Sequence, residues 1–275
     1  MGTEEKPDLK AISGRLTMNS FDLTAIYAVS SRLSLSLTVP FEHADYSTVQ
    51  GDFQRHNGSA GGLGDLRLMA NTWLFNPINH PDGNINIGLG VKFPTGDERA
   101  TDDFHTAVNQ VIIRPVDIAA QPGDGGWGAA LELQAFQKIV ENFYAYLHGF
   151  YLINPRDTNG TERPSPAVPL VNTVPDQYFG RGGLSYAFWA EKGLSFSLGG
   201  RIDGIPVHDL IGDSNGFRRA GYVVYIDPGL NWAFGKNALS VNVPVALSRN
   251  LEPTKTATTG AFADYLVVAT YSRRF

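Results

Sequence analysis

Apolar and polar residues alternate along most of this chain with a period of two. In the segment RLSLSLTVPF at 32–41, apolar side chains occupy the odd positions, and Ser, Thr or Pro occupies most of the even ones. The segments at 84–94, 194–201 and 239–247 repeat the pattern. A period of two places successive side chains on opposite faces of a β-strand, and no segment shows a comparable helical stripe. The sequence therefore predicts an all-β protein.

The alternating segments number eleven, and the connections between them alternate in length. The expected strands lie near 15–29, 32–46, 60–75, 84–95, 127–138, 142–154, 176–190, 193–205, 220–234, 238–250 and 261–275. Short connections lie near 30–32, 76–83, 139–141, 191–193 and 235–237, and long ones at 47–59, 96–126, 155–175, 206–219 and 251–260. Tight turns at one end and long loops at the other are typical of bacterial outer-membrane barrels. We therefore predict one antiparallel transmembrane β-barrel domain over residues 1–275.

Composition agrees with a chain whose surface is only partly meant for water. The 275 residues suit one large barrel or two sandwiches, and only 18% of them are charged, against roughly 25% in soluble domains. The net charge is −5 and no Lys/Arg-rich run occurs, so no nucleic-acid partner is expected. Cysteine is absent, which excludes disulfides, thiolate metal sites and cysteine nucleophiles.

Neither a transmembrane helix nor a signal peptide is visible in the sequence. No run approaches the roughly 18 apolar residues that a spanning helix needs. The first ten residues, MGTEEKPDLK, are polar and acidic, unlike a signal peptide. With the barrel pattern, the expected location is the bacterial outer membrane, with membrane lipids and lipopolysaccharide as partners.

The last residues, YLVVATYSRRF, form an alternating strand that ends on an aromatic side chain. In a barrel, Phe275 would lie at the periplasmic rim, and Tyr265 and Tyr271 would face lipid. This ending resembles the assembly signal of outer-membrane proteins, which implies the assembly machinery as a partner. Arg273 departs from that signal because it holds an outward position that is usually apolar, although near a rim its charge can reach water. The alternative is an ordinary core strand that happens to end the chain.

Two glycine-rich motifs in the first part of the chain carry a family resemblance. GGLGDLRL at 61–68 and GLGVKFPTGD at 88–97 resemble the outer-membrane transporters grouped as the phenol-degradation meta-pathway family, and LSLSLTVPF at 33–41 fits the strand before them. The resemblance covers about the first hundred residues. It implies uptake of hydrophobic or aromatic compounds, and it brings no defined binding residues.

The inward faces of the expected strands supply the candidate solute site. The residues assigned to the lumen are Asp65, Arg67, Asn71, Trp73, Lys92, Glu132, Gln134, Phe136, Tyr144, Tyr146, His148, Arg201, Asp203, Tyr225 and Asp227. Charges in a narrow lumen must pair or stay hydrated. Two interpretations remain open: opposed charges that orient a solute while aromatic rings bind its apolar part, or a charge network that plugs and braces the barrel. A barrel of about twelve strands lies between the sizes that side chains fill and those that leave a wide channel.

The sequence offers no catalytic, metal or cofactor site. The six histidines are scattered without GxSxG or HExxH spacing, although His56 in RHNGS and His105 in DDFHT lie near Ser or Asp. The acidic stretch at 95–104 lacks the ligand spacing of an EF-hand, and GGLGD at 61–65 lacks the lysine and helix of a phosphate loop. We therefore expect no enzyme and no cofactor.

The expected function is passive uptake of small hydrophobic or aromatic solutes across the outer membrane. Two alternatives stay open: a structural or surface-interaction barrel with a plugged lumen, and, more remotely, a lipid-modifying barrel hydrolase.

The strand count raises a separate expectation about the barrel's closure. Eleven is odd, whereas bacterial single-chain barrels have an even number of strands. We therefore expect about twelve strands in the full-length protein, with residues 1–14 as the remnant of an extracellular loop that follows a signal peptide and one more strand. We expect a gap or a strained closure between the strands at 15–29 and 261–275, unless residues 1–14 or a partner strand fills it. Irregular pairing is expected at Pro40, Pro228 and Pro244, because proline removes a ladder hydrogen bond.

Overall fold

The computed structural model describes residues 14–163, 170–254 and 262–275. In these ranges the chain forms one 13-stranded sheet and two small two-stranded sheets, and every named strand pair is antiparallel. The only helical elements there are the single 3₁₀ turns η1 (Ile118–Ala120) and η2 (Ala190–Lys192), so this part of the chain has no helix able to cross a membrane. The all-β prediction is confirmed.

Eleven strands follow one another in the order expected from the sequence. The path of the large sheet is β1 (Arg15–Ala28), β2 (Leu33–Val49), β4 (Arg67–Trp73), β5 (Gly83–Lys92), β8 (Gly128–Val140), β9 (Phe143–Ile153), β12 (Gln177–Trp189), β13 (Leu194–Ile205), β14 (Ala220–Phe234), β15 (Asn237–Asn242) and β17 (Val268–Arg273). Two further strands extend it: β3 (Arg55–Leu63) pairs with β2, and β16 (Val245–Glu252) pairs with β14. The strand expected at 60–75 is therefore divided into β3 and β4, and the strand expected at 238–250 is divided into β15 and β16. The last strand is shorter than the expected 261–275, with an isolated bridge at Tyr265 before it.

Each proline inside the sheet coincides with a break in the neighbouring strand. Beside Pro40 the partner of β2 changes from β4 to β3, and the amide of Gly64 donates to the Pro40 carbonyl at 2.8 Å. Beside Pro228 the partner of β14 changes from β15 to β16, and Pro244 lies in the break between those two strands. The expected irregular pairing is confirmed at all three positions.

The expected long connections are partly folded. The predicted loop at 47–59 is wrong, because β2 and β3 extend through most of it as a hairpin that turns at 50–54. The connection after β5 contains β6 (Thr101–His105) and β7 (Val111–Pro115), and the connection after β9 contains β10 (Thr158–Arg163) and β11 (Leu170–Thr173). Of the loop expected at 251–260, residues 255–260 lie outside the described residues, as do residues 1–13.

The strands sort their side chains by face, as the alternation predicts. Leu147, Leu184 and Leu198 lie on the outer face and are 49%, 53% and 46% exposed. Leu184 lies directly opposite Leu198 in the register. The preceding residue of β12, Gly183, and the following residue of β13, Gly199, also form a register pair, which belongs to the inner face. Small buried clusters lie on the inner side, such as Met69, Ala130 and Leu152. The sheet therefore has a broad apolar exterior and no conventional core between two layers.

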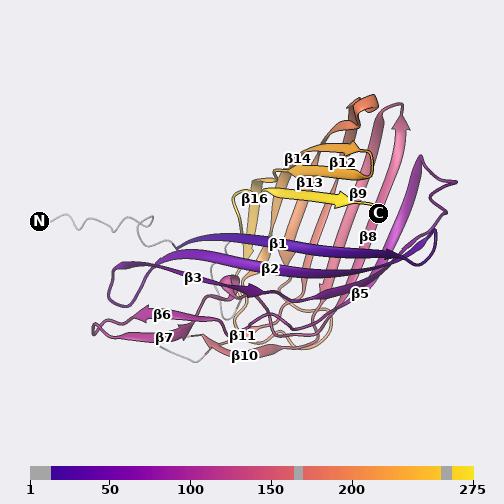
Figure 1. Ribbon diagram of the computed structural model, residues 1–275. Helices are drawn as coiled ribbons and strands as arrows, with labels where there is room; N and C mark the ends of the chain where they lie inside the picture. Colours follow the sequence, from indigo (N-terminus) through magenta and orange to yellow (C-terminus); the bar gives the residue numbers. More distant parts are fainter. Residues whose placement is uncertain (1–13, 164–169, 255–261) are drawn as a thin grey trace, which may run out of the picture.

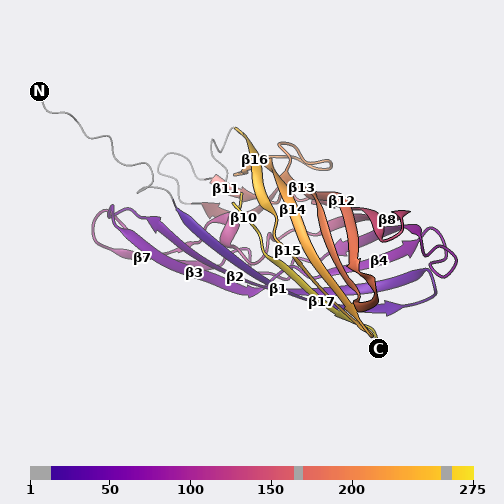
Figure 2. The same cartoon turned by 90° about the horizontal axis from the view of Figure 1, so that it is seen from above.

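The sheet curls strongly, and its two edge strands do not pair. In Figure 1, β1, β2 and β3 run across the view while β8, β9 and β12 stand nearly upright, and Figure 2 shows the same curled wall from above. In the described part of the chain, β1 pairs with β2 alone and β17 with β15 alone. The expected gap between the first and last strands is thus present, and the wall is an open barrel.

Gly183 shows how tightly the wall bends between β12 and β13. A Cβ atom added there would lie 2.3 Å from the Leu198 carbonyl oxygen and 2.5 Å from the Gly199 Cα, whereas one added to Gly62 would meet nothing within 4 Å. We expect Gly183→Val to lower the free energy of unfolding by about 1–3 kcal/mol through overpacking. Gly62→Val is the matched control in urea titrations of the protein in lipid vesicles. Equal losses for the two variants would contradict this account of the bend.

Candidate functional site

Four side chains form a row across the inner wall at one height. The register places His148 of β9 opposite Arg181 of β12, Arg181 opposite Arg201 of β13, and Arg201 opposite Tyr225 of β14. Directly opposed residues on one face of a sheet have close Cβ atoms, and like charges in that position repel. Two opposed arginines therefore need anionic partners nearby.

Each arginine of the row is held from one side by a carboxylate. Arg201 Nε donates to both oxygens of Asp203, at 2.8 and 3.1 Å. Arg181 Nε lies 3.1 Å from Oδ2 of Asp227, whose side chain is fully buried. In the described part of the chain, no hydrogen bond uses the terminal nitrogens of either guanidinium. Asp203 thus fixes the Nε edge of Arg201 by hydrogen bonds, Asp227 attracts Arg181 by charge alone, and the forked ends of both guanidiniums make no hydrogen bond to the described residues.

Aromatic rings surround the same two cations. The Arg201 guanidinium lies 5.2 Å from the centroid of the Phe179 ring, and that of Arg181 lies 5.4 Å from the Tyr146 ring. Phe179 stacks on Phe150 with centroids 5.7 Å apart. Cations over ring faces gain from the quadrupole of the ring and are restricted in orientation. The wall here combines fixed positive charge with flat apolar surface.

A contact between His148 and Glu132 and several unbonded polar atoms complete this part of the wall. His148 Nε2 lies 2.7 Å from Glu132 Oε1, which also accepts from Gln134 Nε2 at 2.8 Å. In the described part of the chain, the buried hydroxyl of Tyr146 and both carboxylate oxygens of Asp227 have no hydrogen-bond partner. Buried polar atoms without partners are costly, so they mark a place where water or a solute group would bind.

The two motifs behind the family resemblance bind one another at the loop end of the wall. Lys92, which is 3% exposed, forms ion pairs with Asp65 at 3.3 Å and with Asp124. The Gly96 amide donates to Asp65 Oδ1 at 2.9 Å, and the Thr95 hydroxyl donates to the Gly64 carbonyl at 2.8 Å. The motifs therefore clamp the break between β3 and β4 to the end of β5.

Buried ion pairs also hold the loops at this end. Arg218 pairs with Asp209, and their side chains are 2% and 0% exposed. Asp209 Oδ1 accepts from the Asp176 amide at 2.8 Å, and the Asp176 carboxylate accepts from the amides of Leu210 and Asn154 at 2.8 and 2.7 Å. The 206–219 connection is thereby fixed to the base of the β9–β12 connection.

The carboxylate of Asp102 helps to fix the β6–β7 hairpin to the wall. Asp102 Oδ2 accepts from the Tyr46 hydroxyl at 2.7 Å and from the Ser59 amide at 3.0 Å. Burial raises the pKa of Asp102, but these hydrogen bonds and one from the Asp103 amide outweigh it, so the pKa lies below its ordinary value. The carboxylate is therefore ionised, and keeps these bonds, at neutral pH.

The sequence-predicted site residues separate into two groups in the structure. Those that share the inner wall of the strands are Arg67, Asn71, Trp73, Glu132, Gln134, Phe136, Tyr144, Tyr146, His148, Arg201, Asp203, Tyr225 and Asp227. Lys92 lies opposite Arg67 on the same face, and together with Asp65 it forms the clamp at the loop end. Sequence reasoning missed Arg181. Its position in FGRGGLSYAFW, three residues before the outward-facing Leu184, places it on the inner face of the same strand.

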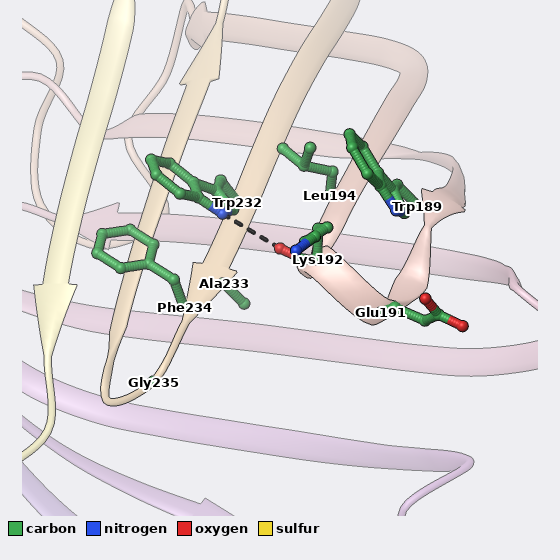
Figure 3. A pocket seen from close by; sticks show the side chains of 8 residues that line it. All are labelled: Trp189, Glu191, Lys192, Leu194, Trp232, Ala233, Phe234 and Gly235. Atoms are coloured by element: carbon green, nitrogen blue, oxygen red, sulfur yellow. Dashed lines mark hydrogen bonds between the residues drawn. The ribbon is translucent and has the colours of Figure 1, made fainter.

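The turn end carries a belt of aromatic residues on the outer face. Trp189, Leu194, Trp232 and Phe234 line a hollow of about 460 Å³. Figure 3 shows these side chains, with Glu191 and Lys192 on the turn beside them. The Trp232 indole donates to the Lys192 carbonyl at 3.2 Å. Tyr271 also faces outward here, opposite Leu239, and Phe275 is fully exposed. Rings with one polar atom collect at membrane interfaces.

The remaining histidine and acidic candidates have structural surroundings. His56 Nε2 lies 2.8 Å from Asp52, and its ring stacks on that of His105 with centroids 3.7 Å apart. These contacts join the β2–β3 hairpin to β6. No group of three or more His, Asp or Glu side chains among the described residues is arranged to hold a metal ion.

Comparisons with known proteins show similarity to solved structures and not to known sequences. No protein-family model matches the sequence, and no curated protein matches it. A structure described as "CymD monoaromatic hydrocarbon channel" is similar at 11% identity and a TM-score of 0.47, over 95% of this chain and 74% of that chain. What this chain does is therefore inferred below from its own residues.

Proposed function

We propose that the chain forms an outer-membrane channel for passive uptake of small hydrophobic or aromatic solutes. The observation that carries this proposal is the separation of faces: large apolar side chains cover the exposed exterior, while charged and aromatic side chains line the interior. Soluble monomers rarely expose contiguous apolar patches beyond a few hundred Å². A lipid environment accounts for such an exterior without a protein partner.

The aromatic belt supports the same orientation in the membrane. Trp189, Trp232 and Phe234 lie at the end of the tight turns, where outer-membrane barrels meet the periplasmic interface. The folded connections with β6–β7 and β10–β11 would then lie on the extracellular side, facing lipopolysaccharide. Phe275 and Tyr271 at the turn end are available to the assembly machinery during insertion.

A plugged structural barrel is the second candidate, and the buried ion pairs at the loop end favour it. Arg218–Asp209 and Lys92–Asp65 tie folded connections to the wall, which suits a permanent cap as well as a rigid mouth. Conduction distinguishes the two functions, because a permanent cap prevents it.

The channel is tested by reconstitution into planar bilayers. Because apolar solutes cross lipid unaided, their entry is measured as a transient block of the ion current. We expect discrete conductance steps and a block by toluene or benzyl alcohol that is at least several-fold more frequent than the block by hexane or hexanol. Absence of any conductance would support the plugged barrel, and turnover of phospholipid or lipid A in detergent would support the hydrolase.

A further inference from the structure

The directly opposed arginines of β12 and β13 have a feature that a bracing network does not need. A bracing pair uses as many guanidinium donors as possible, as Arg218 does with Thr173, Pro206 and Val207. In the described part of the chain, Arg201 donates hydrogen bonds through Nε only, and Arg181 faces Asp227 with Nε at 3.1 Å without forming a hydrogen bond. Their terminal nitrogens therefore remain available to a third group.

The side chains of Arg181 and Arg201 are both partly accessible to solvent. Arg181 and Arg201 are 20% and 18% exposed, in contrast to the fully buried Asp227 behind Arg181. Two planar forks with parallel N–H donors suit a carboxylate, which accepts two hydrogen bonds at once. A carboxylate between the two arginines would also relieve the repulsion between opposed like charges.

The aromatic rings beside the two arginines favour an anion that itself carries a flat ring. Phe179 lies under the Arg201 guanidinium and stacks on Phe150, and the His148 ring meets it edge-on with centroids 4.8 Å apart. Tyr146 lies under Arg181. A flat ring attached to the carboxylate can lie against these faces, whereas a flexible aliphatic chain gains less from them.

We propose that Arg181 and Arg201 bind the carboxylate of small aromatic acids, with benzoate as the simplest representative. The inference rests on the proposed channel function and gives it a solute class. Asp203 and Asp227 already neutralise part of each guanidinium charge, so binding is weak. Weak binding is what passage requires, because a solute must leave the site as readily as it enters.

The test compares benzoate with its neutral isostere benzamide in two measurements. The first is equilibrium dialysis of radiolabelled benzoate against the full chain in detergent, which needs no conduction. The second is the block of ion current in planar bilayers. We expect benzoate to bind and to block at least about fivefold more strongly than benzamide, with cyclohexanecarboxylate in between.

Variants locate the site. Arg181→Gln and Arg201→Gln should each reduce benzoate binding at least about fivefold and leave the block by benzyl alcohol within twofold. Arg249→Gln is the matched control, because Arg249 lies on the same wall but pairs with Asp264. A difference in gel migration between heated and unheated samples shows that each variant is folded. If a glutamine variant misfolds, Arg→Lys at the same position keeps the charge, loses the fork, and should still weaken benzoate binding.

The outcomes separate this inference from the proposed channel. Conductance with equal block by benzoate and benzamide, or benzoate binding unchanged in both glutamine variants, overturns the aromatic-acid site and leaves the channel standing. No conductance overturns the channel, and the dialysis result then decides the site on its own. Equal losses in Arg249→Gln would show a general charge effect and also overturn the site.

Discussion

Leu184→Arg is expected to lower the free energy of unfolding in lipid by about 2–4 kcal/mol, because a charge would enter the middle of the lipid-facing surface. Leu184 is 53% exposed on the outer face, opposite Leu198. The matched control is Ser185→Arg, one residue further along β12 and on the inner wall between Tyr144 and Ser197. There the new guanidinium meets polar neighbours and water, so the loss should be much smaller.

The measurement is a urea titration of both variants in vesicles, followed by tryptophan fluorescence. Both positions lie in the same strand and receive the same new side chain, so the difference between the variants reports mainly the environment of each face. Equal losses would mean that the two faces of β12 meet the same environment, which a lipid-spanning strand does not allow.

Arg218→Met is expected to have an even larger effect, about 3–5 kcal/mol, because it leaves the fully buried Asp209 without its cation. The loss should concentrate in the connection at 206–219, which this pair fixes. Arg219→Met is the control: its bidentate ion pair with Asp117 is 22% and 35% exposed, so its removal leaves a carboxylate that water can reach, and the loss should be smaller.

Hydrogen exchange of the 206–219 amides measures the effect locally. A double variant, Arg218→Met with Asp209→Leu, should recover part of the protection, because neither side chain is then a buried charge. If Arg218→Met and Arg219→Met exchange alike, the buried pair does not fix the loop.

The strands were predictable because the alternation of apolar and polar residues within each strand distinguishes its two faces. The alternation of Leu33, Leu35 and Leu37 with serines depends on residues next to one another, and so does each proline that breaks a ladder. The hairpin over 47–59 was missed because GDFQRHNGSA is rich in small and polar residues and carries no alternation. Its strand pairing comes from the register of β2 with β3, which a local pattern does not contain.

The site was predictable only in outline for the same reason. Phase within a strand predicts which residues face inward, and the register places His148, Arg201 and Asp227 on one face of the sheet. Which of them meet depends on the stagger between strands. The pairing of Arg181 with Asp227 links residues of β12 and β14 across the intervening β13, and no local spacing indicates it.

The central claim, an apolar exterior in lipid around a polar interior, is tested most directly by single-cysteine labelling in vesicles. The chain has no cysteine, so each introduced thiol is unique. Cysteines at Leu133, Gln134, Leu184 and Ser185 sample both faces of β8 and β12. We predict that the thiols at 134 and 185 react with a water-soluble maleimide, while dyes at 133 and 184 are quenched by brominated lipid. Adjacent positions that react and quench alike would contradict the account.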